Sequence, residues 1–428
     1  MRGNATGRYL GLDRGTSGLR AALLDEDGQL VGLWRLPSSP GEPRDEARLW
    51  WRDLITLLHR VAAQCPLDGV RALAVDGTSG TLLACDCNGE PLAPALMYDD
   101  LRASAQAGRI AMQAPADSGA HGAGSSLARL LWLLEHARLP ASFFLQHQAE
   151  WLTGRLLGRY DLGDENNALK LGYDSRTARW PHWLEALSVP RPALPTIHPA
   201  GTPLGRIDLQ AAKLTGLPAD TLVVAGTTDS LAAFLATGAK DEGDAATTLG
   251  STLTLKILSA RPVFDPARGV YSHRLLGRWL AGGASNTGGA VLASLFDTLM
   301  LEQLSRRIDP RRRSCLDYMP LLRPGERFPV NDPTLAPRLH PRPVDDARFL
   351  HGLLDAMARI EAQGYRVLES LGAGTPRRLY TTGGGARNPA WSALRERALG
   401  CRLNTPEHDE AAVGAARLAQ RGALEETP

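Results

Sequence analysis

The chain has 428 residues, of which 43% are hydrophobic and 22% charged, and its 48 basic side chains nearly balance 46 acidic ones. This length predicts two or three domains with a substantial apolar core. The formal net charge of +2 lacks the basic excess that is typical of nucleic-acid-binding proteins, so we expect no nucleic-acid partner.

The cysteines and the apolar pattern indicate a reducing compartment and no membrane segment. The five cysteines are scattered, and none forms a C-x-x-C pair. Met1 to Tyr9 contains no apolar signal core, and no stretch reaches about 18 uninterrupted apolar residues. The sequence therefore predicts a cytoplasmic protein without a membrane partner.

The first patterned segment predicts three strands around a glycine turn. A strand ends at Asp13, a Gly-Thr-Ser-Gly turn follows at 15–18, and further strands cover Leu19–Leu24 and Gln29–Leu36. The turn places backbone N–H groups and two hydroxyls at a strand tip, which suits a phosphate. Asp13 beside this turn suits a divalent cation.

The first half continues with helices and a second glycine turn. Apolar spacing predicts a helix over Glu46–Ala63, and a buried strand from Val70 to Val75 ends in Asp76-Gly-Thr-Ser-Gly80. Further helices are expected at Ser125–Glu135 and Phe143–Leu152, and a proline-rich irregular connection at Pro181–Pro203.

The middle of the chain repeats the opening pattern. A buried strand from Thr221 delivers Asp229 at its end, and residues 245–258 then form a strand, a Gly-Ser-Thr turn and a second strand. We interpret this as an internal duplication with a period of about 235 residues. Two related lobes, each presenting a phosphate loop to a shared cleft, follow from it, with a boundary between Gly238 and Gly243.

The second half combines loops with a strand–glycine turn–helix unit. Gly282–Gly289 precedes a helix from Ala290, Pro310–Pro343 is predicted to be loop, and a long helix covers Asp346–Leu371. The strand Arg378–Thr382 then runs into three consecutive glycines and a further helix. This arrangement can accept a nucleotide at the start of the helix.

These segments supply the components that phosphoryl transfer to an alcohol requires. Two glycine turns, at Gly15–Gly18 and Gly250–Thr252, can hold phosphates through backbone N–H groups. Asp13 can hold Mg²⁺, and Asp229 can act as a general base, which contributes about 10²–10⁴ in rate. A Walker-type G-x-x-x-x-G-K-[ST] is absent, and the glycines at 383–385 do not match a dinucleotide fingerprint.

Each element also has a purely structural interpretation. A D-x-G-T-S sequence alone is often an ordinary turn, and three glycines can form a flexible one. Asp99 and Asp100 can cap the helix that follows them. Arg14 either reaches a phosphate or lies on the surface. The order of the whole set favours the functional interpretation.

In this order the motifs resemble the FGGY carbohydrate kinase family, within the actin/Hsp70/hexokinase-like ATPase fold, over residues 8–260 and 280–418. The resemblance implies an α/β fold with two ribonuclease H-like (actin-like ATPase) domains and a cleft between them. Residues 1–240 would form the N-terminal FGGY domain, with the sugar site and the catalytic base. Residues 241–428 would form the C-terminal, ATP-binding FGGY domain. The family also implies ATP and Mg²⁺ as cofactors, a small sugar as substrate, and in many members a homodimer.

The resemblance assigns roles to individual residues. Asp229 becomes the catalytic base and Asp13 the metal ligand. The substrate-binding candidates are Asp13, Thr16, Ser17, Gly18, Asp76, Thr78, Ser79, Asp99 and Arg102. The ATP-binding candidates are Gly15, Thr16, Ser17, Gly250, Ser251, Thr252, Gly288, Gly383, Gly384, Gly385 and Asn388.

Within the family, some stretches look most similar to the D-ribulose kinase or xylulokinase-like branch. These are Val75–Leu83, Met97–Arg102, Asn166–Asp174 and Gly226–Gly238. The glutamine-and-arginine-rich sugar loop usual in glycerol kinases is not seen. We therefore expect D-ribulose as the substrate, with D-xylulose second. The alternative is a non-kinase actin-fold ATPase or a sugar-sensing regulatory protein, without a base placed at a sugar hydroxyl.

Overall fold

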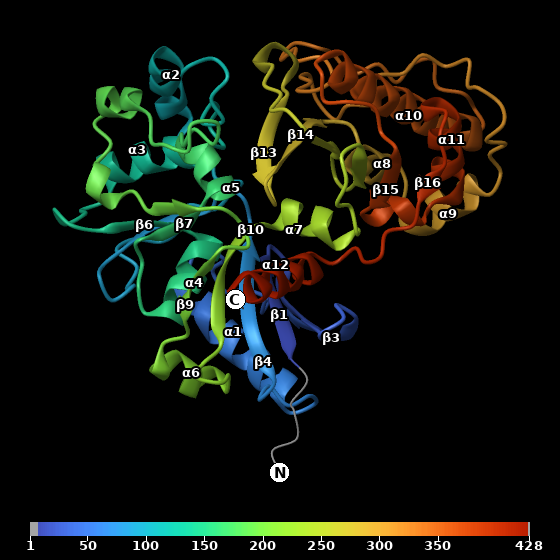
Figure 1. Ribbon diagram of the computed structural model, residues 1–428. Helices are drawn as coiled ribbons and strands as arrows, with labels where there is room; N and C mark the ends of the chain where they lie inside the picture. The colour runs from blue at the N-terminus through green and yellow to red at the C-terminus, as the bar shows by residue number, and fades with distance from the viewer. Residues whose placement is uncertain (1–6, 427–428) are drawn as a thin grey trace. The chain divides into compact units, whose positions relative to one another are not determined.

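The computed structural model describes residues 7–426, and the chain divides into two compact units (Figure 1). Unit 1 comprises Met1–Ala236, Arg274–Gly277 and Glu410–Pro428, and unit 2 comprises Thr237–His273 and Arg278–Asp409. The sequence predicts that Met1 to Tyr9 contains no signal core. Most of this segment lies outside the described residues.

Unit 1 is built on a six-stranded sheet of order β3-β2-β1-β4-β10-β9. β1 is antiparallel to β2 and parallel to β4, and β10 is parallel to β4. The strands are β1 (Arg8–Gly15), β2 (Gly18–Leu24), β3 (Leu30–Pro37), β4 (Val70–Gly77), β9 (Pro203–Arg206) and β10 (Leu222–Thr228).

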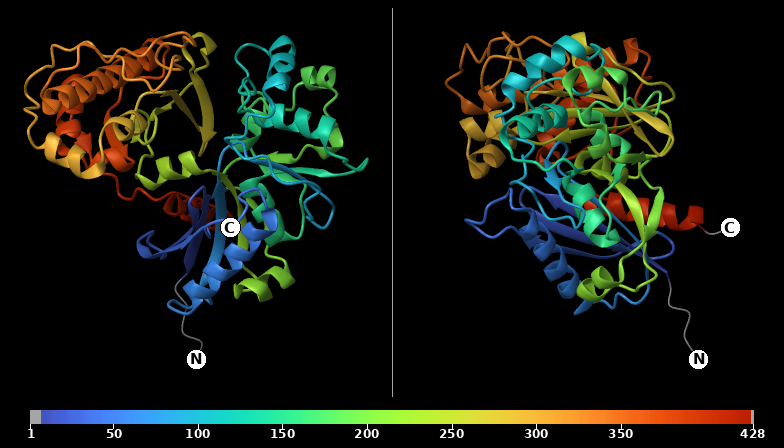
Figure 2. Two further views of the ribbon diagram at one scale, coloured as in Figure 1. Left: turned by 180° about the vertical axis from the view of Figure 1, so that it is seen from behind. Right: turned by 90° about the vertical axis from the view of Figure 1, so that its left-hand side faces the viewer.

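Helices cover both faces of this sheet (Figure 2). On one face Leu10 of β1 belongs to the same apolar core as the buried side of α1 (Ala47–Ala62). On the other face Gly11 lies against α12 (Ala411–Glu426), where a Cβ would come within 1.9 Å of the Ala412 carbonyl oxygen. The missing side chain at Gly11 therefore lets the last helix pack directly on β1.

Unit 2 is built on a second six-stranded sheet, of order β13-β14-β12-β11-β15-β16. β12 is antiparallel to β11 and β14, and β15 is parallel to β11 and β16. The strands are β11 (Asp244–Leu249), β12 (Leu253–Ser259), β13 (Tyr271–Leu275), β14 (Arg278–Ser285), β15 (Arg378–Thr382) and β16 (Leu403–Asn404).

The two sheets share one topology. The run β3-β2-β1-β4-β10 in unit 1 and the run β14-β12-β11-β15-β16 in unit 2 have the same order of two antiparallel and then two parallel pairs. In each unit a short glycine-containing turn joins the central antiparallel pair, β1–β2 or β11–β12. The predicted duplication of a β-turn-β element is thus confirmed.

The remaining elements surround these sheets. The helices are α2 (Ser104–Gln113), α3 (Ser126–His136), α4 (Gln148–Leu157), α5 (Glu165–Ala168), α6 (Leu209–Thr215), α7 (Asp229–Ala236), α8 (Gly289–Leu295), α9 (Thr298–Ser305), α10 (Asp346–Ser370) and α11 (Pro389–Leu399). Two small sheets pair β5 (Leu82–Cys85) with β6 (Phe144–His147), and β7 (Leu162–Asp164) with β8 (Thr196–His198). None of the helices within residues 7–426 is both long and apolar enough to cross a membrane.

One secondary-structure prediction is wrong in part. The helix expected over Phe143–Leu152 begins only at Gln148, because Phe144–His147 forms a strand paired with β5. A partner strand far along the chain therefore decides the conformation of these four residues.

The last helix returns to unit 1. α12 packs on α7 and on the strands β1, β4 and β10. The chain from Glu410 onward therefore belongs with the N-terminal half, and unit 2 ends at Asp409. The division predicted between residues 240 and 241 stays a prediction, and the return of α12 to unit 1 was not part of it.

Unit 2 contains a fully buried ion pair between two of its helices. Arg395 of α11 donates from Nε and Nη2 to the two carboxylate oxygens of Glu361 in α10, at 2.6 and 2.7 Å. Its Nη1 also donates to the Thr381 hydroxyl of β15 at 2.9 Å. Glu361 accepts a further bond from Thr247 of β11 at 2.7 Å. The pair therefore fastens both helices to two central strands.

Replacing Arg395 by methionine should lower the free energy of unfolding of unit 2 by about 3–5 kcal/mol, because Glu361 is then left buried without its counter-ion. Hydrogen exchange of the α10 and α11 amides measures the loss. The control Arg307→Met removes an exposed pair with Asp345 and should cost about 1 kcal/mol or less. Equal losses in the two variants would contradict the assignment.

Candidate active site

Two aspartates lie side by side where the central parallel strands of unit 1 end. The register of β1 and β4 places Asp13 directly beside Asp76, and Thr227 of β10 follows in the same row. Neighbouring strands are about 4.8 Å apart, so side chains at matched positions on one face are in contact. Both aspartates are buried, with exposed fractions of 4% and 0%.

The pKa values of the two carboxyl groups are raised. Burial raises the pKa of Asp13, and burial followed by the charge of Asp13 raises the pKa of Asp76 well above its ordinary value. Among the described residues, neither oxygen of Asp76 nor Oδ1 of Asp13 receives a hydrogen bond from a separate donor. One proton held between the two carboxyl groups would satisfy both and would leave the pair with one negative charge.

Arg20 balances the remaining charge of the acid pair. Its Nη1 donates to Oδ2 of Asp13 at 2.9 Å, and its Nη2 donates to the Ser17 hydroxyl at 3.0 Å. Its Nε lies 3.3 Å from a carboxylate oxygen of Glu410. Sequence reasoning missed Arg20, although the hairpin register pairs it with Asp13 across β1 and β2. A basic residue opposite an acidic one in a predicted hairpin was the available signal.

Asp229 begins α7 directly after β10, at the position expected from the sequence. It is half-buried, and its Oδ1 accepts a hydrogen bond from the Ser230 N–H at 2.6 Å. Its charge adds to the rise in the pKa of Asp76, behind burial and Asp13, so the two carboxyl groups are within electrostatic reach. A helix N-terminus stabilises the negative charge of a carboxylate.

Tyr98 is a second residue that sequence reasoning missed. Its side chain is 41% exposed, and its pKa is raised by burial and, more weakly, by the charges of Asp99 and Asp229. Tyr98 therefore lies near the candidate base. An accessible aromatic ring there can stack against a polyhydroxylated ligand. An aromatic residue directly before a pair of aspartates was the signal in the sequence.

Two predicted sugar-binding residues of the second glycine turn, Thr78 and Ser79, differ in whether the protein already uses their hydrogen-bonding groups. The Thr78 hydroxyl donates to Oε1 of Gln148 at 2.8 Å and lies 2.6 Å from the Thr81 hydroxyl. Its bonding capacity is therefore used within the protein, and Thr78 builds the turn. Ser79 follows it, and Lys170 donates from Nζ to the Ser79 carbonyl oxygen at 3.4 Å.

Asp99 and Arg102 face a different place from the acid pair. They line an open pocket of about 350 Å³ together with Arg44, Asp45, Ala95, Met97 and Asp100. Asp99 accepts a hydrogen bond from Arg44 at 3.1 Å, and Arg102 donates from Nε to Asp100 at 2.8 Å. Neither Asp13 nor Asp76 lines this pocket, so the structure does not bring all predicted sugar residues into one cavity.

The first phosphate turn, residues 15–18, joins β1 to β2, with Thr16 and Ser17 exposed. The surface interpretation of the neighbouring Arg14 is wrong. Arg14 is buried, and its Nη1 donates to Oδ2 of Asp53 in α1 at 3.1 Å, because its side chain points to the sheet face that α1 covers. Contact of Arg14 with a phosphate stays a prediction.

In unit 2 the turn Gly250–Thr252 is supported by the start of α8. Gly289 donates from its backbone N–H to the Gly250 carbonyl oxygen at 2.8 Å, and Ala290 donates to that of Ser251 at 3.1 Å. The predicted ATP residue Gly288 directly precedes these donors. The structure therefore brings Gly288 and the 250–252 turn together.

The glycine turn at 383–385 packs beside the 250–252 turn. Gly383 has φ +84°, in the left-handed region, and a Cβ there would come within 2.6 Å of the Leu249 carbonyl oxygen. Because Leu249 directly precedes Gly250, the predicted nucleotide-binding turns of unit 2 are adjacent. Gly384 has no backbone atom near its open side, so its face of the turn is accessible.

Asn388, by contrast, uses its side chain within the protein. Its Oδ1 accepts from the Trp391 N–H at 3.1 Å, and its Nδ2 donates to the Ser305 hydroxyl at 2.8 Å. It is the N-cap of α11. Asn388 therefore positions the helix that follows the glycine turn.

A comparison of the two units supports a chemical role for the acid pair. Thr248 and Thr382 are register partners on β11 and β15, the positions in unit 2 that correspond to Asp13 and Asp76. Their hydroxyls are 2.9 Å apart. The fold therefore accepts an ordinary hydrogen-bonded pair at this place. A buried acid pair costs stability that the threonine pair of unit 2 does not.

Metal binding at this site would rest on few protein ligands. Within residues 7–426, no three His, Cys, Asp or Glu side chains are grouped to hold a metal ion. Oδ1 of Asp13 has no donor outside the acid pair, and a cation bound there would take the place of a proton between Asp13 and Asp76. Mg²⁺ commonly takes one or two carboxylates and completes its shell with water and phosphate oxygens, so Asp13 fits such a site.

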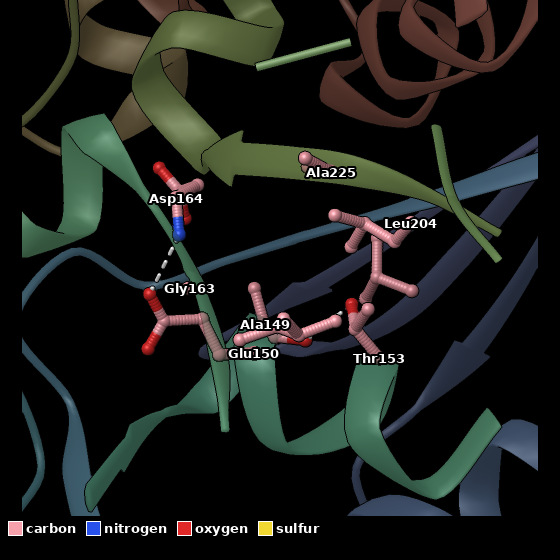
Figure 3. Close-up of a pocket in the computed structure, with 10 residues that line it drawn as sticks. Ala149, Glu150, Thr153, Gly163, Asp164, Leu204 and Ala225 are labelled. Atoms are coloured by element: carbon pink, nitrogen blue, oxygen red, sulfur yellow. Dashed lines mark hydrogen bonds between the residues drawn. The ribbon is translucent and has the colours of Figure 1, made fainter. Parts of the chain in front are cut away.

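A second cavity in unit 1 is much smaller (Figure 3). It measures about 10 Å³, room for about one water molecule. On its wall Glu150 accepts a hydrogen bond from the Asp164 N–H at 3.0 Å, and burial raises the pKa of Asp164 to about 6. This cavity cannot hold a sugar.

Comparison with known proteins agrees with the geometry. The family model described as the N-terminal domain of the FGGY family of carbohydrate kinases matches residues 8–236, and that of its C-terminal domain matches residues 245–423. A xylulose kinase of Escherichia coli is 25% identical over 96% of this chain and 89% of its own length. An autoinducer-2 kinase of Yersinia enterocolitica is 24% identical over 97% of this chain and 87% of its own. The crystal structure of xylulose kinase from Rhodospirillum rubrum superposes with a TM-score of 0.85 at 22% identity, covering 98% of this chain and 91% of that one.

The shared proton predicts a pH dependence of stability. From about pH 4 upward the unfolded chain releases protons that the Asp13–Asp76 pair retains, so the stability of unit 1 should fall as pH rises. Asp76→Asn keeps a donor toward Asp13 but has no proton to lose, and its melting temperature should fall less between about pH 4 and pH 7. Thr382→Val in unit 2 removes no titrating group and should leave the wild-type slope. Parallel melting curves for wild type and Asp76→Asn would contradict a shared proton.

Proposed function

We propose a substrate and a catalytic base for this chain on the premise that it belongs to the FGGY family of carbohydrate kinases. It is thus a sugar kinase, a phosphotransferase with the two-domain α/β fold of actin-like ATPases. Its substrates are ATP and a sugar. The proposal is that unit 1 binds a ketose, most simply D-ribulose, and that unit 2 binds ATP.

The base in this proposal is Asp229, and the observation that carries it is its place beside the acid pair. The carboxylate follows a central strand, and a helix N-terminus favours its charged form. Asp76 is protonated with Asp13, so it cannot compete for the substrate's proton. As the terminal hydroxyl attacks the γ-phosphorus, its proton passes to Asp229, the new P–O bond forms, and ADP leaves.

The phosphates in this proposal are held by backbone N–H groups. The turns at 15–18 and 250–252 are the candidate grips, and the accessible face of Gly384 is the candidate adenosine contact. Asp13 would hold Mg²⁺, directly or through water. The bound metal would neutralise charge on the transferring phosphoryl group. Arg20 bonds to both Asp13 and Ser17, so it would fix the distance between the 15–18 turn and the acid pair.

The choice of sugar rests on local stretches and not on overall identity. The two relatives described above bear the names of kinases for different substrates at nearly the same identity. The stretches Val75–Leu83 and Met97–Arg102 favour D-ribulose, and the first of them contains Asp76. We also propose cytoplasmic action, which agrees with five free cysteines, and a homodimer as in many family members.

Removal of the proposed base should abolish most turnover. Asp229→Ala is expected to lower kcat by about 10²–10⁴, because no other group takes the hydroxyl proton, while the Kd for ATP stays within about twofold of wild type. A coupled ADP assay and calorimetric titration measure the two quantities. Asp68→Ala, at an exposed aspartate of the same unit, is the control and should retain full activity. Full turnover in Asp229→Ala would exclude it as the base.

A substrate screen separates the candidate functions. With D-ribulose, D-xylulose, sedoheptulose, ribitol and glycerol, kcat/KM should be highest for D-ribulose, by about tenfold or more over D-xylulose, which corresponds to about 1.4 kcal/mol. A preference for D-xylulose would correct the sugar and leave the reaction intact. ATP hydrolysis that no polyol stimulates would instead favour a non-kinase ATPase or a regulatory protein.

A further inference from the structure

A fully buried arginine connects the loops of the candidate sugar site. Arg129 of α3 has an exposed fraction of 0%. Its Nη1 donates to the carbonyl oxygens of Gly80 and Gly124, at 2.9 and 2.8 Å. Its Nη2 donates to the carbonyl oxygens of Tyr98 and Asp100, at 2.6 and 3.2 Å. One guanidinium therefore holds four backbone positions.

These carbonyl groups belong to segments that carry proposed sugar residues. Gly80 is the last residue of the turn that contains Ser79. This turn follows β4, which carries Asp76. Tyr98 and Asp100 flank Asp99 in the loop before α2. The two segments are also joined directly, because Leu82 and Leu96 form an antiparallel bridge and the Tyr98 N–H donates to the Thr81 hydroxyl at 3.1 Å. Arg129 adds a further link, to Gly80 on one segment and to Tyr98 and Asp100 on the other.

The helix that carries Arg129 is also held through Ser126, which lies one turn earlier on the same side of the helix. Ser126, three residues earlier, has its hydroxyl 2.8 Å from Nε2 of His147, and Nδ1 of His147 lies 2.7 Å from Glu150. Glu150 in turn accepts from the Asp164 N–H, the bond drawn in Figure 3. A buried polar chain thus runs from α3 through α4 to β7, and it fixes where the guanidinium stands.

A purely structural role explains this arrangement poorly. Burial lowers the pKa of Arg129, which shows that the charged form is costly there, and Asp100 and Asp99 offset only part of that cost. An apolar side chain of similar volume fills such a space without the desolvation penalty. A planar guanidinium provides several hydrogen-bond donors in fixed directions. It can therefore join separate loops at a defined spacing, which an apolar side chain cannot do.

We propose that Arg129 is a positioning residue for the sugar: it sets the spacing between the 77–81 turn and the 97–102 loop, and thereby the affinity for the ketose, without contacting ATP. This inference rests on the proposed function of unit 1 as the ketose-binding unit. Arg129 acts on Ser79 and Tyr98 through their backbone, and it touches neither the sugar nor the reacting atoms.

The test compares the KM values for the two substrates in Arg129→Lys and Arg129→Met. A lysine ammonium cannot span both loops, so Arg129→Lys should raise the KM for D-ribulose about tenfold, and Arg129→Met about a hundredfold. In both variants the KM for ATP should stay within about twofold of wild type. The control Arg395→Lys alters an equally buried arginine of unit 2 and should leave the KM for the ketose unchanged while lowering the melting temperature.

Amide hydrogen exchange supplies a readout that does not depend on turnover. In Arg129→Lys the amides of residues 79–81 and 98–101 should exchange faster, whereas those of β1 and α1 should not. Unchanged exchange in these loops, an unchanged ketose KM, or an equal rise in both KM values would overturn the inference. If the wild type phosphorylates no ketose, the proposed function fails instead, and the exchange data still decide whether Arg129 holds the loops. If Arg129→Met does not fold, Arg129→Lys carries the test.

Discussion

The parallel register of β1 and β4 is the constraint on which the site depends. It places Asp13 beside Asp76 at the ends of two buried strands, and β10 adds Thr227 and then Asp229 along the same edge. Open α/β sheets commonly bind ligands beyond the carboxyl ends of their strands. Burial there prevents neighbouring carboxylates from all carrying a charge. Burial accordingly raises the pKa of both Asp13 and Asp76.

Duplication places different side chains at matched positions of one scaffold. The topology is shared over five strands in each unit, yet the row that contains Asp13 and Asp76 in unit 1 contains Thr248 and Thr382 in unit 2. The threonine pair is neutral and satisfied by one hydrogen bond. The two rows thus differ by two side chains at matched positions, and the turns beside them differ by one residue, with two residues between Gly15 and Gly18 and three between Leu249 and Leu253. Function is located in these sites and not in the fold itself.

The sequence allowed prediction of what local patterns encode. Asp13, Asp229 and the glycine turns follow buried strands, and strand ends are recognisable from apolar runs that stop at glycine. What sequence reasoning could not reach depends on partners far along the chain. Arg14 is buried because it bonds to Asp53 of α1, which is 39 residues away in the sequence. The Thr78 hydroxyl is occupied because it bonds to Gln148, which is 70 residues away. The strand at Phe144–His147 likewise exists only because β5 pairs with it.

The motif residues divide into those that build a turn and those that can face a ligand, and the reason is physical. A loop at a strand end has no ladder to fix it, so side chains must do so, and each one used in this way is lost to the ligand. The Thr78 hydroxyl, the Asn388 amide and the Arg129 guanidinium are each hydrogen-bonded within the protein. What remains available is the Ser79 side chain, the Tyr98 ring, and backbone N–H groups of the turns. A glycine motif read from sequence therefore names the place of a binding site more reliably than the atoms that do the binding.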